Sequence, residues 1–385
     1  MDSHFDAVII GAGPAGNSAA LTLKKAGRHV LVVDQASFPR DKVCGGFLGA
    51  ENKNFLDEWG IWDDLKAQGA REIENIRLAS ARGVEMICRR TSQGLAGLGV
   101  SRRLLDQTFQ KASCRNGIVF RDATSVARSV QQDGQWTIEL VSRADHKKTV
   151  VTARHLIHAA GAPKIHKPHP QDLIGAGALF ENAVIPTDEV GLYFASGIHT
   201  GVNPFENGLT NVCYAASRKT FERMNRSLPR LFEFLKESNA PLKNFFRAVE
   251  PVTPWKAVTV PYRPAFQFYD NGIFYTGDAA AVVHPVIGGG MTLAIGGGVL
   301  LGNVLASGLK EREAAVIYQK TFLKLYALRI QFSWRLGRMA HHRAIVDVVI
   351  STGPACRRGR PACRKFFEWM FEFNHSPLTL QAGLA

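Results

Sequence analysis

The beginning of the chain alternates short apolar runs with one stretch of helical length. Phe5–Ile10 and His29–Val33 are almost continuously apolar, which is typical of parallel strands that helices cover on both faces. Ala15–Ala26 lies between them as a predicted helix, and Gly27 is suited to end it in a left-handed turn. The pattern therefore predicts a strand–helix–strand unit in a parallel sheet.

The hydrophobic pattern changes in the middle of the chain. Apolar runs at 118–120, 136–141 and 156–157 predict further strands around the first unit. Residues 175–268 predict a mainly antiparallel sheet with a helical insert near 219–250. Inside this region we expect a strand–turn–strand unit, made of 191–195, the turn at 203–208 and 211–214.

Glycines stand where the first strand passes into the helix. Gly11 permits a tight turn, Gly13 lets the backbone approach a pyrophosphate, and Gly16 lets the helix pack closely on the strand. The start of the helix, including Ala15, directs free N–H groups and a partial positive charge at phosphates. Asp34 ends the second strand, where an acid can bind a ribose 2′-hydroxyl. These residues predict a dinucleotide-binding half.

A second cofactor-binding surface is predicted far along the chain. Gly277 and Asp278 follow a strand end at 274–276, and an apolar helix is expected over 291–305. The turn before that helix brings the backbone close to a bound group and could stabilise a negative charge there; its members are Pro285, Gly288, Gly289, Gly290 and Met291. The alternative is a helix whose small residues only permit close packing. A nicotinamide enzyme needs no such second surface, so the segment favours a flavin.

Two further stretches resemble the geranylgeranyl reductase branch of the flavoprotein monooxygenase superfamily. One is Ser-Arg-Arg-Leu-Leu-Asp at 101–106, similar to the Arg-x-x-x-Asp of that family. The other is Phe-Pro-Arg-Asp-Lys-Val-Cys-Gly-Gly, which contributes four candidate site residues: Arg40, Cys44, Gly45 and Gly46. The resemblance implies that Arg102 lies near the ribityl and phosphate region of FAD. It also implies that Asp278 binds a ribityl hydroxyl and that Pro285 faces the isoalloxazine ring.

The resemblance also implies the fold class. We expect an α/β protein with a Rossmann-like FAD-binding domain, an inserted, mainly antiparallel β-sheet substrate domain and a helical C-terminus. The FAD-binding domain is expected to be discontinuous, over 1–80, 100–174 and 269–350. The substrate domain is expected over 81–99 and 175–268, and a basic, aromatic C-terminal segment over 351–385. We expect non-covalent FAD, because the sequence requires no His or Cys for its attachment.

The chain departs from this superfamily at two places. Many aromatic hydroxylases have an Asp-Gly motif that contacts both FAD and NADPH, but Ala160 stands where that aspartate would be. The electron source is therefore left open between NADH, NADPH and a partner such as a flavin reductase. The Trp-x-Trp-x-Ile-Pro signature of flavin-dependent halogenases is absent as well, which disfavours halogenation.

Two side chains are candidates for chemistry. Cys44 lies between basic residues and two glycines, where a thiol can be exposed and activated, although it could equally be a small buried hydrophobe. His284 could act as an acid or base, although such a histidine more often bonds to backbone. Three aromatic residues are candidates for the wall of a lipophilic cavity, each with core packing as its alternative: Phe180, Tyr193 and Tyr214.

Composition agrees with a cytoplasmic globular enzyme. The six cysteines are scattered without metal-ligand spacing, so no metal is expected. No signal peptide or membrane-spanning segment is predicted. Much of the net charge of +14 follows residue 329, interleaved with aromatic residues. This predicts either an ordinary amphipathic helix or peripheral contact with an anionic membrane, and no motif indicates nucleic-acid binding.

Three functions remain open. Reduced FAD could hydroxylate or epoxidise a small lipophilic substrate, whether aromatic, polyketide or isoprenoid. It could instead transfer hydride to a C=C bond, with Cys44 near the reacting carbon. The Cys-Gly-Gly loop favours reduction and the breadth of the superfamily favours oxygenation, which we rank narrowly first. The third possibility is an FAD-binding partner protein without catalysis.

Overall fold

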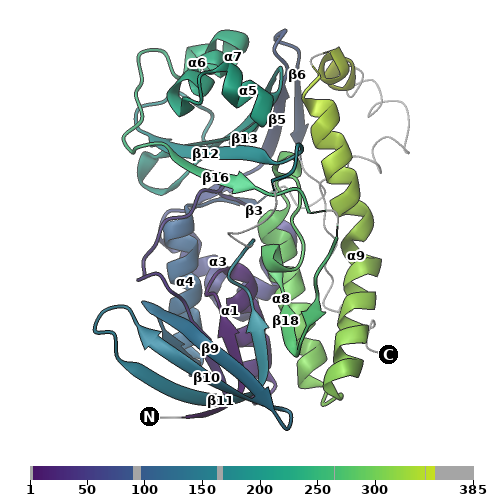
Figure 1. Cartoon of the computed structure of the whole chain (residues 1–385). Helices are drawn as coiled ribbons and strands as arrows, with labels where there is room; N and C mark the ends of the chain where they lie inside the picture. Colours follow the sequence, from purple (N-terminus) through teal and green to yellow (C-terminus); the bar gives the residue numbers. More distant parts are fainter. Residues whose placement is uncertain (1–2, 90–96, 163–167, 264, 343, 352–385) are drawn as a thin grey trace.

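Two halves lie one above the other in the computed structural model, and a long helix runs along one side of both (Figure 1). That helix is α9 (Glu311–Ala340). Each half is built around its own sheet, as the sequence predicts. The structure describes residues 3–89, 97–162, 168–263, 265–342 and 344–351.

The sheet of the lower half contains eight strands within these ranges. Its main path runs β17-β18-β11-β1-β2-β8, and β9 and β10 extend it from β11 as an antiparallel hairpin. The contacts of β1 with β2 and β11 are parallel, so the predicted strand–helix–strand unit is present. The strands are β1 (His4–Ile10), β2 (Val30–Val33), β8 (Val119–Arg121), β9 (Thr124–Gln132), β10 (Gln135–Ser142), β11 (Lys148–His158), β17 (Tyr269–Asp270) and β18 (Ile273–Tyr275).

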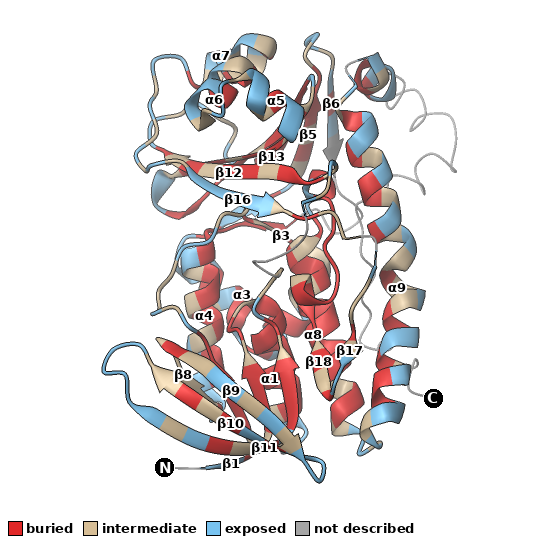
Figure 2. Ribbon diagram, in the orientation of Figure 1, coloured by how far each residue is buried: buried red, intermediate tan, exposed pale blue. Residues whose placement is uncertain are grey.

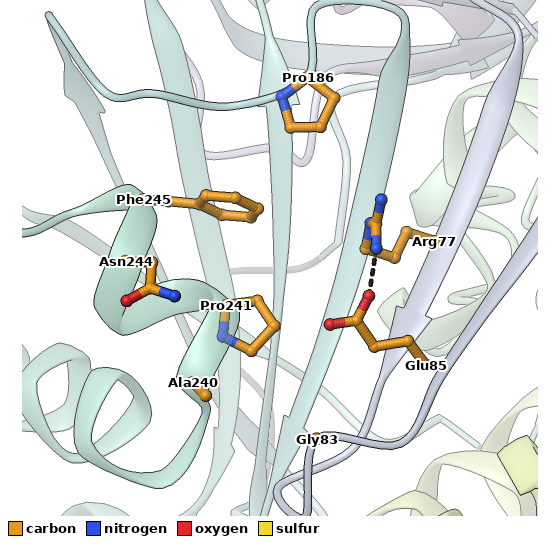
Figure 3. A pocket seen from close by; sticks show the side chains of 8 residues that line it. All are labelled: Arg77, Gly83, Glu85, Pro186, Ala240, Pro241, Asn244 and Phe245. Atoms are coloured by element: carbon orange, nitrogen blue, oxygen red, sulfur yellow. Dashed lines mark hydrogen bonds and ion pairs between the residues drawn. The ribbon is translucent and has the colours of Figure 1, made fainter.

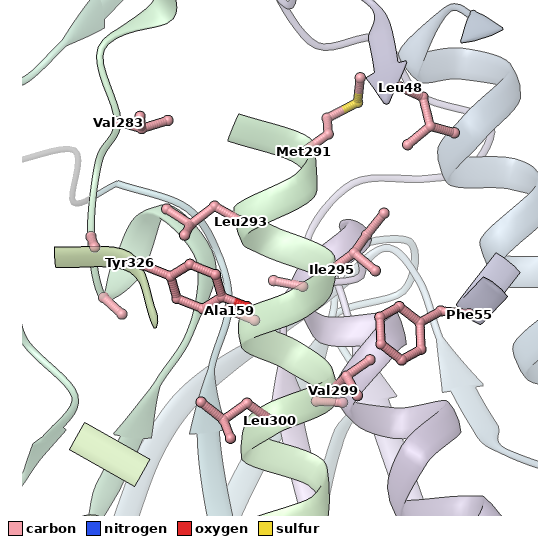
Figure 4. Close-up of a cluster of buried hydrophobic side chains, with 14 of the residues drawn as sticks. Leu48, Phe55, Ala159, Val283, Met291, Leu293, Ile295, Val299, Leu300 and Tyr326 are labelled. Carbon is pink, nitrogen blue, oxygen red and sulfur yellow. The ribbon is translucent and has the colours of Figure 1, made fainter. Parts of the chain in front are cut away.

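Helices α1 (Pro14–Lys25) and α8 (Gly290–Ala306) pack closely beside this sheet. A Cβ added at Gly298 of α8 would collide with the carbonyl oxygen of Ala15, and one at Gly302 would lie 2.7 Å from Cβ of Thr22. Small residues in the middle of α8 therefore permit the close approach of the two backbones. The larger apolar side chains of α8 point away from its axis on both sides, toward Tyr326 and toward Phe55 (Figure 4).

The upper half contains a seven-stranded sheet, counted over the described ranges, with the order β16-β12-β15-β14-β13-β5-β6. The helical insert predicted near 219–250 is confirmed as three short helices that pack on one face of this sheet (Figure 2): α5 (Arg218–Arg223), α6 (Leu228–Ser238) and α7 (Ala240–Phe245). The strands are β5 (Asn75–Ala79), β6 (Glu85–Arg89), β12 (Leu173–Phe180), β13 (Glu189–Ala195), β14 (Ile198–Pro204), β15 (Thr210–Ser217) and β16 (Lys256–Val260).

The remaining elements include a small sheet, three helices and short 3-10 turns. A small sheet pairs β7 with β3 and β4, and α4 begins directly after β7. These elements are β3 (Phe47–Gly49), β4 (Arg71–Ile73), β7 (Gly97–Gly99), α2 (Lys53–Glu58), α3 (Ile61–Ala67) and α4 (Arg102–Arg115). Short 3-10 turns are η1 (Ala50–Asn52), η2 (Glu206–Gly208), η3 (Gly277–Ala279) and η4 (Pro285–Ile287).

Two details differ from the sequence prediction. The stretches 191–195 and 211–214 are not paired with each other, because β14 lies between β13 and β15 and is bonded to both. In addition, β5 belongs to the upper sheet through parallel pairing with β13, so the chain first enters the upper half before residue 81. Both features depend on pairing between distant segments, which local pattern does not reveal.

The C-terminal region is described only as far as Ser351. Trp334 of α9 is buried, and its indole nitrogen donates to the carbonyl oxygen of Val282. This part of the region therefore packs its aromatic residue against the body of the protein. The predicted segment 351–385 lies almost wholly outside the described residues. Among the described residues, no helix is both long and apolar enough to cross a membrane.

Candidate active site

The N-terminus of α1 faces two arginine side chains. Gly13 caps this helix, and a Cβ added to it would lie 3.6 Å from Nη2 of Arg102 and 3.7 Å from Nη2 of Arg40. The Nε of Arg40 is buried and has no hydrogen-bond partner among the described residues. Two guanidinium groups and a helix N-terminus thus lie close together, and all three favour an anion. The arrangement fits the pyrophosphate of a dinucleotide.

The two arginines share one buried carboxylate, Asp106. Nε and Nη2 of Arg102 donate to its two oxygens at 2.9 and 2.8 Å, and Nη1 of Arg40 lies 3.1 Å from Oδ2. Burial by itself would lower the pKa of Arg102, but Asp106 more than compensates, so that pKa is raised. Sequence analysis did not include Asp106 among the site residues. The signal was its position four residues after Arg102, where the two side chains share a helix face.

Asp34 holds the glycine turn against the end of β2. Its Oδ2 accepts from the backbone nitrogen of Ala12 at 2.9 Å, and its Oδ1 accepts from that of Ala36 at 2.9 Å. Nη2 of Arg40 lies 3.6 Å from Oδ2. The carboxylate therefore lies beside the glycine turn and close to Arg40. Its contact with a ribose hydroxyl stays a prediction.

The second predicted surface meets the first. Gly277 and Asp278 form η3 directly after β18, and Asp278 is close enough to help raise the pKa of Arg102. Gly288 has a φ of +65° in the turn after η4, and a Cβ added there would lie 3.7 Å from Cδ1 of Phe47. The turn that contains Pro285, Gly288 and Gly289 therefore lies beside Phe47, the first residue after the loop 40–46 that contains Cys44, which we call the cysteine loop. Gly290 and Met291 begin α8, with the Met291 side chain buried.

A cavity of about 90 Å³ lies where the two halves meet. Its lining includes Cys44, the start of α4 at Ser101 and Arg102, and Leu179 and Asn211 from the upper sheet. Cys44 is partly exposed, and its Sγ accepts from the backbone nitrogen of Gly46 at 3.5 Å. The thiol thus borders a cavity that also contains one of the two phosphate-facing arginines.

Two asparagines of the upper sheet hold the cysteine loop. Nδ2 of Asn211 donates to the carbonyl oxygens of Cys44 and Gly45, each at 3.1 Å. Nδ2 of Asn203 donates to the Gly45 oxygen at 3.2 Å. Sequence analysis missed both asparagines. Asn203 and Asn211 stand at strand positions that face the other half. Which positions face that way can be recognised only once the pairing of the strands is known.

The three aromatic wall candidates lie on the other face of the upper sheet. Phe180, Tyr193 and Tyr214 are fully buried in the cluster under α6 and α7. The Tyr214 hydroxyl donates to the carbonyl oxygen of Leu228 at 2.8 Å. Successive side chains of a strand point to opposite faces, so Leu179 and Asn211 border the cavity while Phe180 and Tyr214 do not. These three side chains therefore pack in the core, which was the alternative to a place in the cavity wall.

His284 is not among the residues that line the cavity of Cys44. Its Nδ1 accepts from the backbone nitrogen of Val286 at 3.2 Å, and its ring centroid lies 5.4 Å from that of His199 and 6.3 Å from that of His341. His284 therefore makes a hydrogen bond to backbone, which was the alternative to a role as an acid or base. The described residues contain no group of His, Cys, Asp or Glu arranged to hold a metal ion.

These buried histidines predict a loss of stability in acid. Burial lowers the pKa of His284 to about 3 and that of His341 to about 4, whereas an unfolded histidine titrates near 6.5. As pH falls, the unfolded chain therefore binds protons first, so the stability present above about pH 6.5 is lost progressively toward pH 4. We expect each ring to lower the free energy of unfolding by about 2 kcal/mol at pH 5. Urea unfolding between pH 7.5 and 5 measures this change.

A pair of variants checks the origin of this pH dependence. His341→Phe removes one buried titrating ring and should flatten the dependence on pH. His146→Asn changes an exposed histidine with a positive φ, which asparagine tolerates, and should leave it unchanged. An unaltered slope in His341→Phe would contradict the assignment.

A larger cavity lies elsewhere, on the outer side of the upper half. It measures about 390 Å³ and includes Arg77, Pro241 and Phe245 in its lining (Figure 3). Arg77 is already paired with two carboxylates, those of Glu85 and Glu189. The charge of Arg77 is therefore compensated within the protein, and this cavity contains neither Cys44 nor the two arginines beside α1. The smaller cavity beside Cys44 is therefore the candidate active site.

Comparison with known proteins agrees with this geometry. The chain matches a family model described as an FAD binding domain over residues 4–319. A conditioned medium factor receptor 1 of Dictyostelium discoideum is 25% identical over 346 residues, which are 81% of this chain and 65% of that protein. A menaquinone reductase of Mycobacterium tuberculosis is 35% identical over 168 residues, 42% of this chain and 39% of that protein. The chain thus spans less than two thirds of the length of the first curated relatives it matches.

Two further proteins are similar over most of the chain. The mitochondrial squalene epoxidase 2 of Arabidopsis thaliana is 25% identical over 417 aligned residues, which cover 100% of this chain and 68% of that protein. A solved geranylgeranyl bacteriochlorophyll reductase-like protein of Thermoplasma acidophilum has a TM-score of 0.78 at 18% identity, and covers 96% of this chain and 100% of that one. The latter confirms the fold class that the sequence predicted.

Proposed function

Because the chain belongs to the FAD-binding-domain family, we propose that it is an FAD-dependent oxidoreductase that reduces a C=C bond of a small isoprenoid substrate. The observation that carries this proposal is the position of Cys44. Its thiol borders the cavity between the two halves, beside Arg102. Alkene reduction needs a proton donor at the reacting carbon, and a partly exposed thiol on a fixed loop can serve as one.

Each part of the site then has a role. Arg40, Arg102 and the N-terminus of α1 bind the pyrophosphate of FAD, and Asp106 keeps the two guanidinium groups in place. Bound FAD supplies the hydride. Asn203 and Asn211 hold the Cys44 loop through its carbonyl oxygens, which fixes the thiol relative to the cavity. The cavity lining includes the apolar residues Val43, Leu179 and Phe205 beside the charged residues Asp41, Lys42 and Lys256, and we assign the apolar residues to contact with the hydrocarbon chain.

The similarity to a menaquinone reductase supports a prenylated substrate. Enzymes of this kind act on small molecules and receive electrons from a donor. We infer that the donor is NADH, NADPH or a partner reductase, and Ala160 in place of the usual aspartate favours the partner. Peripheral contact with a membrane through the basic C-terminal region would bring the enzyme to such a substrate, and it is part of the same proposal.

Oxygenation is the second candidate, and the sequence alone ranked it narrowly first. Similarity to a squalene epoxidase along the whole chain favours it. An oxygenating flavin would place no demand on a thiol, because its reactivity comes from the cofactor and the dipoles around it. We rank alkene reduction above oxygenation because Cys44 lies at the cavity, where reduction would use its thiol as a proton donor.

Replacing Cys44 with serine separates the two functions. If the chain reduces alkenes, Cys44→Ser should keep FAD bound and reducible but lower turnover of a prenylated quinone roughly a hundredfold, because a positioned proton donor is lost. Cys114→Ser, which alters a free cysteine on α4, should have no effect. Turnover within about twofold of the wild type in Cys44→Ser would refute the role of the thiol and restore oxygenation as the better candidate.

A further inference from the structure

A second cysteine lies close to Cys44. Cys213 follows Asn211 by two residues on β15, so both side chains point to the same face of the sheet. Asn211 is bonded to the backbone of Cys44 at 3.1 Å. Gly177 of β12 pairs with Cys213, and a Cβ added to Gly177 would lie 3.8 Å from Sγ of Cys213 and 3.6 Å from Cγ1 of Val43. Val43, next to Cys44, and the Cys213 sulfur therefore both lie beside the same residue of β12.

The two thiols have different surroundings. Cys44 borders the cavity and its sulfur accepts a backbone hydrogen bond from Gly46. Burial, and then the proximity of Cys44, raise the pKa of Cys213 to about 12. Cys44 lines the cavity and Cys213 is not among its lining residues, so Cys44 is the sulfur that a small oxidant in the cavity meets first. The raised pKa makes Cys213 the less reactive thiol, so it reacts only with the sulfenic acid that its neighbour Cys44 has already formed.

We propose that Cys44 and Cys213 form a reversible disulfide that closes the cavity under oxidising conditions. The oxidant is hydrogen peroxide, which reduced flavin releases when it reacts with dioxygen instead of substrate. Peroxide oxidises the Cys44 sulfur to a sulfenic acid and leaves one water. The Cys213 sulfur then displaces the hydroxyl group, which leaves as a second water with the thiol proton. Two thiols and one peroxide thus give one disulfide and two waters, and a dithiol reductant reverses the change.

This inference goes beyond the proposed function and holds for either reaction of the flavin. The disulfide would stop the enzyme from producing more peroxide. Whenever turnover is uncoupled from substrate, the peroxide formed in the cavity removes the free thiol at Cys44 and ties the loop to β15. The site would then stay closed until a reductant opens it.

Mass spectrometry of the FAD-loaded full chain tests the proposal. The protein is treated with stoichiometric hydrogen peroxide in the presence of dimedone, which traps sulfenic acids, and the remaining thiols are alkylated before digestion. The wild type should yield a peptide pair linked through Cys44 and Cys213 and little dimedone adduct, and dithiothreitol should restore both thiols. Cys114→Ser should behave identically, because Cys114 lies outside the pair.

Cys213→Ser should accumulate the dimedone adduct on Cys44, since no resolving thiol remains. Cys213→Ala provides the same test with a side chain that cannot hydrogen-bond. A wild-type protein that carries dimedone on Cys44 while Cys213 is alkylated, or that links Cys44 to another cysteine, would overturn the proposal. These readouts need no turnover, so a linked pair together with normal turnover in Cys44→Ser would refute the proposed function and leave this inference standing.

Discussion

Replacing Gly13 with valine is expected to abolish FAD binding and leave the apoprotein folded. The backbone at Gly13 is extended, with a φ of −79°, so a branched side chain fits it without strain. The added Cβ would point into the space beside Nη2 of Arg40 and Nη2 of Arg102. A valine there would occupy the volume that the pyrophosphate needs. Titration of apoprotein with FAD, followed by flavin fluorescence, measures the loss.

Asp34→Ala is the graded comparison. This change removes a carboxylate that accepts from the backbone nitrogens of Ala12 and Ala36. We expect its loss to weaken the free energy of FAD binding by about 1.5–3 kcal/mol. FAD should therefore bind more weakly but still measurably. Equal losses of affinity in the two variants would contradict the assigned geometry, as would an apoprotein of Gly13→Val that unfolds at a much lower temperature than the wild type.

Asp106→Asn is expected to destabilise the apoprotein by about 3–5 kcal/mol. Arg102 and Arg40 are largely buried and share this carboxylate, so its neutralisation leaves Arg102 without its ion pair and Arg40 with only the longer contact to Asp34 at 3.6 Å. The phosphates of FAD would restore part of the lost charge, so saturating FAD should recover much of the stability. Urea unfolding of the apo and FAD-loaded forms measures both effects.

Asp64→Asn is the matched control for this variant. Asp64 pairs with Arg115 at 2.7 Å, but both side chains are well exposed to solvent. Such a surface pair contributes about 1 kcal/mol at most. Equal destabilisation by Asp64→Asn and Asp106→Asn, or no recovery of Asp106→Asn by FAD, would show that the buried cluster does not serve an anion.

The cofactor half could be predicted from sequence because its signals are local. Gly11, Gly13 and Gly16 act within one turn, and Asp34 follows at the end of the next strand, so spacing alone places them together. The helix predicted over 291–305 and the turn before it were recognisable for the same reason. Arg102 was identified through its resemblance to known flavoproteins, and its neighbour Asp106 was within reach of the same argument.

The substrate half could not be predicted in the same detail. Which residues face the cavity depends on the register of β12, β14 and β15, and a shift by one residue exchanges the two faces. Sequence analysis chose Phe180 and Tyr214, whose size and polarity suit either face. The structure puts Leu179 and Asn211 at the cavity instead. His284 was ambiguous because its packing partners come from β14 and α9, which are distant in the chain.

One measurement tests the central claim most directly. The FAD enzyme is reduced chemically without oxygen and mixed anaerobically with a polyprenyl menaquinone, and the product is weighed by mass spectrometry after the quinone ring has been re-oxidised in air. The account predicts a product that retains two added hydrogen atoms in the prenyl chain, formed as the flavin becomes oxidised. A flavin that stays reduced until oxygen-18 is admitted, followed by a product carrying one labelled oxygen atom, would contradict it.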